Sequence, residues 1–260
     1  VAFGEALLAE TPANDVRNAV REISIDAWAY SISFYRPLAS SWLRASKKLV
    51  GFDPSIYSPD GNHYSGYRLI GGVLAASRIV KHRTHGEKNI GILLPPSSAG
   101  VISNLAVWVR RKVVVNLNYT SAPDVVAVCA EKAEVKTVFT SRVFIDKLKS
   151  KGKDFTSLEK YCKFIYMEDA FAGIPKYKLL LHLILGVILP ARLLEFIYFR
   201  HAKLSDTAAI LFSSGSEGTP KGICLSHLNM MGNIEQTSCI VNMGRGDVML
   251  AELPMFHSFG

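Results

Sequence analysis

The most informative stretch of this chain is Ser213-Ser214-Gly215-Ser216-Glu217-Gly218-Thr219-Pro220-Lys221-Gly222. The apolar run 207–212 precedes it and is typical of a buried strand that enters a loop. Glycines let the backbone approach a ligand closely, and hydroxyl groups donate hydrogen bonds to phosphate oxygens. Lys221 adds a compact positive charge. The stretch therefore predicts a loop that holds a polyphosphate, and the alternative is a Ser/Gly-rich surface turn.

The order of residues in this loop differs from a Walker A motif. That motif has Gly, four residues and Gly-Lys-Ser/Thr, followed by a helix that begins at the phosphates. Counting from Gly215, Pro220 stands where the second glycine is required. Gly222 stands where Ser or Thr would reach Mg²⁺. Because residues 222–225 also favour a strand, we expect a strand–loop–strand clamp, with a helix that begins only at Ser226.

The rest of the chain alternates short apolar runs with segments of helical periodicity. The apolar runs predict strands over residues 89–95, 113–118, 137–140, 163–167 and 248–253. The periodic segments predict helices over residues 67–82, 101–109, 122–133 and 226–241. We expect the apolar residues of the last helix to pack into the core, namely Met230, Met231, Ile234 and Ile240. This alternation predicts an α/β fold with parallel strand pairs.

Several stretches resemble the adenylate-forming superfamily, which includes acyl-CoA synthetases, acyl-carrier-protein synthetases, peptide-synthetase adenylation domains and luciferases. Residues 213–222 resemble its phosphate loop, and Pro254-Met255-Phe256-His257-Ser258-Phe259-Gly260 resembles its next motif. Residues 89–120 resemble its first α/β unit, particularly in acyl-carrier-protein synthetases, although Arg110, Arg111 and Val114 depart from the usual small residues and proline. The resemblance implies the N-terminal part of the adenylate-forming enzyme fold, built from layered βαβ units.

The resemblance also implies a chemistry: a fatty carboxylate attacks the α-phosphate of ATP, and the acyl group then passes to a thiol. Lys221 and His257 would be the catalytic residues, and Phe256 and His257 would lie beside the acyl substrate. His257 as a core or loop histidine is the alternative, and Glu217 either orients the loop or is a solvated turn residue. Mg²⁺ would be required, with its ligands beyond Gly260. The residues implied in nucleotide binding are Ser213, Ser214, Gly215, Ser216, Glu217, Gly218, Thr219, Lys221 and Gly222.

The N-terminal segment carries a second resemblance. Residues 1–4 predict a short strand, and Thr11-Pro12 predicts a helix start with Thr11 as N-cap. This strand-helix segment resembles the C-terminal tail of lysophospholipid and glycerophosphate acyltransferases; an unrelated extension is the alternative. We therefore divide the chain into an acyltransferase-like tail, residues 1–35, and the N-terminal portion of an AMP-binding acyl-activating domain, residues 36–260.

The composition excludes some classes of protein and favours some kinds of partner. A hydrophobic content of 49% excludes general disorder. The formal net charge of +8 favours anionic partners, here an acidic carrier protein and an anionic membrane surface; a solvated basic surface is equally compatible with it. We expect no nucleic-acid partner. None of the 4 cysteines forms a CxxC pair, so neither a zinc site nor a disulfide framework is predicted.

Residues 179–199 allow three interpretations. From Leu179 to Leu189 only His182 is polar, and Pro190, Arg192 and Glu195 then interrupt the run. A bilayer span needs about 20 apolar residues, and the uninterrupted part covers about half of that length. The segment is a transmembrane helix, an interfacial helix with basic residues at the headgroups, or a buried helix or helical hairpin. The basic residues are Lys176, Lys178, Arg192 and Arg200.

Both resemblances together favour a bifunctional enzyme. Because the chain begins with Val1 and stops at Gly260 inside a motif, we expect an internal fragment without turnover of its own. The full-length protein would activate a long-chain fatty acid with ATP, load it onto acyl carrier protein and re-acylate a lysophospholipid at the cytoplasmic side of the inner membrane. A stand-alone long-chain acyl-CoA synthetase and a non-catalytic membrane or lipid-binding module are the alternatives.

Overall fold

The computed structural model describes residues 3–58, 63–213, 220–241, 244 and 246–257. Its centre is a six-stranded sheet with the order β6-β5-β3-β4-β7-β8. All neighbouring pairs in it are parallel except β7 and β8, which are antiparallel. The strands are β3 (Asn89–Leu93), β4 (Val113–Asn116), β5 (Thr137–Thr140), β6 (Lys163–Tyr166), β7 (Thr207–Ser213) and β8 (Lys221–Ser226). The predicted parallel α/β arrangement is confirmed, and the two strands of the predicted strand–loop–strand clamp, β7 and β8, form an antiparallel pair.

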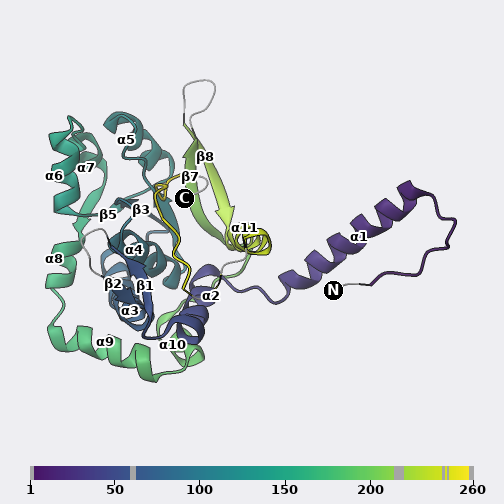
Figure 1. Cartoon of the computed structure of the whole chain (residues 1–260). Coiled ribbons are helices and arrows are strands. Elements are labelled where there is room, and N and C mark those ends of the chain that lie inside the picture. The colour runs from purple at the N-terminus through teal and green to yellow at the C-terminus, as the bar shows by residue number, and fades with distance from the viewer. Residues whose placement is uncertain (1–2, 59–62, 214–219, 242–243, 245, 258–260) are drawn as a thin grey trace.

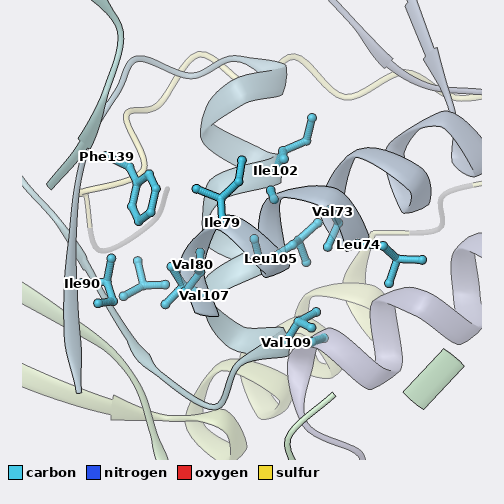
Figure 2. Close-up of a cluster of buried hydrophobic side chains, with 14 of the residues drawn as sticks. Val73, Leu74, Ile79, Val80, Ile90, Ile102, Leu105, Val107, Val109 and Phe139 are labelled. Atoms are coloured by element: carbon cyan, nitrogen blue, oxygen red, sulfur yellow. The ribbon is translucent and has the colours of Figure 1, made fainter. Parts of the chain in front are cut away.

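Helices cover both faces of the sheet (Figure 1). Because side chains alternate along a strand, Val114 and Phe139 join the core on one face while Val115 and Val138 join the core on the other. The first core contains α3 (Gly66–Arg83) and α4 (Ser98–Val109), and Figure 2 shows their side chains gathered beside the sheet residues Ile90 and Phe139. The second contains α5 (Pro123–Lys132), α6 (Arg142–Ser150) and α7 (Thr156–Tyr161).

Shorter elements close the body around α3. The small antiparallel hairpin of β1 (Pro54–Tyr57) and β2 (His63–Ser65) leads into that helix, and the Ser65 side chain caps it by accepting from the Arg68 N–H. The other elements are α2 (Leu38–Ala45), the π-helix η1 (Ser46–Val50), α8 (Met167–Ala172), α9 (Lys176–Ile188), α10 (Ala191–Tyr198) and α11 (His227–Ile240).

The N-terminal helix projects from this body (Figure 1). It is α1 (Ala13–Ile32), which confirms the predicted helix and has no buried residue. Two details were wrong. Phe3 and Gly4 lie outside any strand, because no described strand edge pairs with them. The N-cap is Pro12 rather than Thr11, because the Thr11 hydroxyl donates to the Leu8 carbonyl in the preceding turn (2.7 Å).

The segment that follows β8 differs from expectation as well. Met231 of α11 is buried, but Ile234 and Ile240 are exposed, because the buried residues of this helix all lie in its first two turns. Residues 248–253 form no strand, because β8 bonds to β7 and no described strand bonds to these residues. Residues 179–199 lie in α9 and α10, which are separated by Leu189 and Pro190. Among the described residues, no helix has both the length and the apolar character that crossing a bilayer requires.

Candidate functional site

The β7–β8 hairpin positions the two ends of the Ser/Gly-rich stretch. Ser213 and Lys221 face each other in its register, and Phe212 faces Gly222. A Cβ atom on Gly222 would lie 3.3 Å from the Phe212 ring, so glycine lets this ring cover the strand end. Both Ser213 and Lys221 are exposed. Six of the seven intervening residues lie outside the described part of the chain, namely Ser214, Gly215, Ser216, Glu217, Gly218 and Thr219.

A lysine from α5 supports the far end of the loop. Lys132 Nζ donates a hydrogen bond to the Pro220 carbonyl oxygen (3.0 Å). Pro220 directly precedes β8, so this bond ties the loop exit to the helix that follows β4. Sequence reasoning missed Lys132, because the bond joins residues that are 88 positions apart and leaves no local pattern.

Phe256 and His257 return to the sheet near the same loop. The Phe256 ring packs edge-to-face against Tyr119, with 5.0 Å between ring centroids, and Tyr119 packs in the same way against Phe144. Burial raises the pKa of the Tyr119 hydroxyl, which keeps this aromatic stack neutral. The His257 N–H donates to the Pro254 carbonyl (2.9 Å) in a turn that leaves the His257 side chain exposed.

A cavity of about 580 Å³, here called the loop cavity, joins these parts. Ser213, Pro220, Phe256 and His257 line it. It opens at the carboxyl ends of the parallel strands β4 and β7, where ligands bind in open α/β sheets. Its remaining wall contains Leu117, Asn118, Ser121, Val125, Val126, Cys129, Leu211, Phe212, Ile223 and Leu225. Burial raises the pKa of the Cys129 thiol, so this residue contributes a neutral wall rather than a nucleophile.

A second cavity of about 540 Å³, here called the apolar cavity, adjoins the first. Leu211, Leu225 and His257 border both cavities, so His257 stands at their junction. The floor carries a reciprocal amide pair: Asn104 and Asn116 each donate to the other, at 3.3 and 3.0 Å. Most other lining residues are apolar, including Trp42, Val101, Leu105, Trp108, Ala209, Met230, Ile234 and Met255.

The structure brings together part of the predicted site. Ser213, Phe256 and His257 line one cavity, whereas Lys221 and Gly222 stand at the loop end of the hairpin and line neither cavity. Sequence reasoning missed Asn118 and Ser121. Their position in the sequence could have predicted them, because polar residues that directly follow a buried parallel strand lie at its carboxyl end, where ligands bind. Among the described residues, no group of three or more His, Cys, Asp or Glu side chains could hold a metal ion.

His227 has a structural position. It is 2% exposed, and its Nδ1 accepts the Leu38 N–H at 3.4 Å. Its ring centroid lies 6.5 Å from that of Trp108. Burial lowers the pKa of His227, with the nearby Asp206 opposing that shift. A neutral imidazole thus anchors the start of α11 behind the apolar cavity.

A doubly covered parallel sheet is extended by a hairpin, and Ser213 and Pro220, which flank its Ser/Gly-rich stretch, line a cavity. This arrangement defines an α/β protein with a candidate nucleotide-phosphate site. The profile of the family described as AMP-binding enzyme matches residues 73–260, more than half of the chain. The chain belongs to this family, and the predicted fold, the N-terminal part of the adenylate-forming enzyme fold, is confirmed.

Individual relatives match smaller shares of their own length. A long-chain-fatty-acid–[acyl-carrier-protein] ligase of Arabidopsis thaliana chloroplasts is 43% identical over 54 residues, which are 21% of this chain and 7% of that protein. The 4-coumarate–CoA ligase-like protein 6 of Arabidopsis thaliana is 27% identical over 178 residues, 66% of this chain and 29% of that protein. The o-succinylbenzoate CoA synthetase of Bacillus subtilis, solved with an acyl-adenylate, superposes with a TM-score of 0.66 at 15% identity, over 85% of this chain and 50% of that chain.

Proposed function

We propose that this chain supplies the ATP-phosphate site and part of the acyl site of an enzyme that activates long-chain fatty acids. The observation that carries the proposal is the junction of the two cavities at His257, directly beside the base of the β7–β8 loop. One cavity reaches the loop and the other is mostly apolar. A carboxylate at the end of an acyl chain and the α-phosphate of ATP would meet at this junction.

The reaction needs placement more than it needs a protein nucleophile. The fatty carboxylate attacks the α-phosphorus, a new acyl–phosphate bond forms, and pyrophosphate leaves with the electron pair of the broken bond. Holding the two reactants in line lowers the barrier, and cationic and N–H donors stabilise the growing phosphate charge. Lys221 and the residues from Ser213 to Gly222 hold the β- and γ-phosphates in this scheme. Mg²⁺ neutralises phosphate charge when it is bound, and His257 positions the carboxylate.

The second half-reaction is proposed to use the thiol of acyl carrier protein. The support is the 43% identity to a long-chain-fatty-acid–[acyl-carrier-protein] ligase over a fifth of this chain. Coenzyme A is the alternative acceptor, because a long-chain acyl-CoA synthetase of Arabidopsis thaliana peroxisomes is 39% identical over 57 residues. Incubating the full-length protein with ATP, palmitate and each acceptor in turn separates the two, since only the true acceptor discharges the acyl-adenylate quickly.

A coupled acyl transfer to a lysophospholipid is the further part of the proposal. It rests on the likeness of residues 1–35 to an acyltransferase tail, and it makes the full-length protein a bifunctional 2-acylglycerophosphoethanolamine acyltransferase and acyl-[acyl-carrier-protein] synthetase. A His-x4-Asp motif encoded upstream of Val1 would support this fusion. An upstream sequence without such a motif would favour the stand-alone acyl-CoA synthetase.

The decisive experiment is ATP–pyrophosphate exchange by the full-length protein, with and without a long-chain fatty acid. We expect fatty-acid-dependent exchange, and we expect Lys221→Ala and Ser216→Ala each to reduce it by roughly 10²-fold or more, because each removes a preorganised phosphate donor. Lys160→Ala is the matched control, since Lys160 is an exposed lysine on α7, remote from the loop in sequence. Absence of exchange with every fatty acid would remove the synthetase function and favour the non-catalytic lipid-binding module.

A further inference from the structure

The inner side of α9 is fixed to the body. A Cβ atom on Gly71 of α3 would lie 3.0 Å from the Leu183 Cα, and one on Gly186 would lie 3.0 Å from the Ile70 side chain. The two backbones therefore approach each other closely at Gly71, and the Ile70 side chain packs on Gly186. Lys47 Nζ donates to the Gly186 and Val187 carbonyls at 2.6 and 3.2 Å, which satisfies carbonyl groups in the last turn of α9. The inner side of α9 is therefore packed against the body and is not open to a partner.

The opposite side of α9 and α10 is apolar as well, and it faces solvent. We call it the outer stripe: Tyr177, Leu180, Leu181, Ile184 and Ile188 of α9, with Leu193, Phe196 and Ile197 of α10. The α9 members recur at helical spacing, so they share one face. Ile188 is 71% exposed and Phe196 is 78% exposed. A soluble surface rarely groups large apolar side chains in this way unless a partner covers them.

Cations flank the outer stripe. At about 100° per residue, Lys176 and Lys178 lie on either side of Tyr177, and Arg192 lies beside Leu193 in the same manner. All three are exposed. The acid of α10, Glu195, turns away from the stripe and is paired with Arg44 at 2.5 Å. An apolar face flanked by Lys and Arg is the arrangement of helices that lie in a membrane interface, with the cations at the headgroups.

We propose that the outer stripe of α9 and α10 inserts into the interfacial layer of a bilayer that contains anionic phospholipid. Charge favours this occupant over a second copy of the chain. A symmetric pair of stripes would bring Lys176, Lys178 and Arg192 of one copy close to those of the other, whereas anionic headgroups neutralise them. The arrangement also leaves the site in water: α9 and α10 lie along the bottom of Figure 1, and the loop-flanking ends of β7 and β8 point to the top.

Vesicle binding by the 260-residue chain tests the proposal. The vesicles contain phosphatidylethanolamine and phosphatidylglycerol at 3:1, and binding is measured by co-sedimentation. We expect the chain to bind, and we expect Ile188→Ser with Phe196→Ser to lower the partition coefficient at least tenfold, because two apolar side chains lose their burial in lipid. The matched control is Phe52→Ser with Ile240→Ser, which removes residues that are 76% and 84% exposed elsewhere. Thermal unfolding verifies that each variant folds.

A charge variant distinguishes insertion beside anionic headgroups from non-specific adsorption to vesicles. Lys176→Gln with Lys178→Gln is expected to weaken binding to the anionic vesicles roughly tenfold and to leave binding to phosphatidylcholine vesicles unchanged. Equal binding by the Ile188/Phe196 variant and the control would overturn the proposal. So would a dimer in sedimentation velocity that the Ile188/Phe196 variant dissociates, since a second copy would then cover the stripe. Vesicle binding requires neither ATP nor fatty acid, so its outcome is independent of the proposed acyl activation.

Discussion

At the residue scale, His227 links pH to stability. Burial holds its pKa below the ordinary value, so the folded chain keeps the imidazole neutral where the unfolded chain protonates it. The unfolded state therefore binds more protons below about pH 6.5, and the free energy of unfolding falls as the pH is lowered from that point toward the folded-state pKa. Burial lowers the pKa of His182 in the same sense.

Replacing His227 with Asn measures how much His227 contributes to this pH dependence of stability. His227→Asn keeps an acceptor near the Nδ1 position and removes the titrating group. Below about pH 6.5, the free energy of unfolding of the variant is therefore expected to depend less steeply on pH, by up to about 1.4 kcal/mol per pH unit. Urea unfolding at several pH values between 7 and 5 measures this slope. His85→Asn, at an exposed histidine, serves as the control and should leave the slope unchanged. Identical slopes for the wild type and His227→Asn would show that His227 does not carry the effect.

At the element scale, two adjacent glycines of α3 have opposite roles. Gly71→Ala would force a methyl group against the backbone of Leu183 and separate α3 from α9. Gly72→Ala would meet only the tip of the Ile102 side chain, at 3.3 Å, and it gains helix propensity. We expect Gly71→Ala to lower the free energy of unfolding by about 1–3 kcal/mol. We expect Gly72→Ala to be neutral or stabilising by up to about 1 kcal/mol.

Denaturant unfolding of the two variants, measured side by side, checks this difference. The reverse order of stability would mean that α9 moves away from α3 without cost, and it would contradict the fixed inner side of α9 on which the outer stripe depends. The pair is well matched because both changes add one methyl group to neighbouring positions of the same helix.

The elements that sequence predicted well are those whose signal is local. The strands β3 to β6 are short apolar runs between polar residues, and their burial follows from that composition alone. Residues 248–253 have the same composition but form no strand, because a strand also needs an edge to pair with. The same limit applies to the site. The loop was evident from its residues, whereas the Lys132–Pro220 bond and the cavity junction at His257 arise from contacts between distant segments.

At the scale of the whole molecule, the boundary near residue 35 is a prediction that remains to be measured. Helix α1 buries none of its residues, and its described contacts with the body include Trp28, which lies over Gly232. Removing residues 1–35 also removes Tyr35, which packs against the cluster of Leu38, Ala208 and Met231, so we expect the free energy of unfolding to fall by about 1–2 kcal/mol. Thermal unfolding and circular dichroism of residues 36–260 provide the measurement, with the 260-residue chain as reference. Loss of a cooperative transition would place α1 within the folding unit.

The strand order also bears on how the chain is made. β4 pairs with β3, which precedes it, and with β7, which begins 94 residues later (Val113 to Thr207). At about 5–20 residues per second, a ribosome needs roughly 5–20 s to deliver β7 after β4. Throughout that interval the outer edge of Val113–Asn116 has no strand partner, and unpaired apolar edges attract other chains. The nascent chain thus exposes an unpaired apolar edge until β7, the strand that leads into the Ser/Gly-rich stretch, has been synthesised.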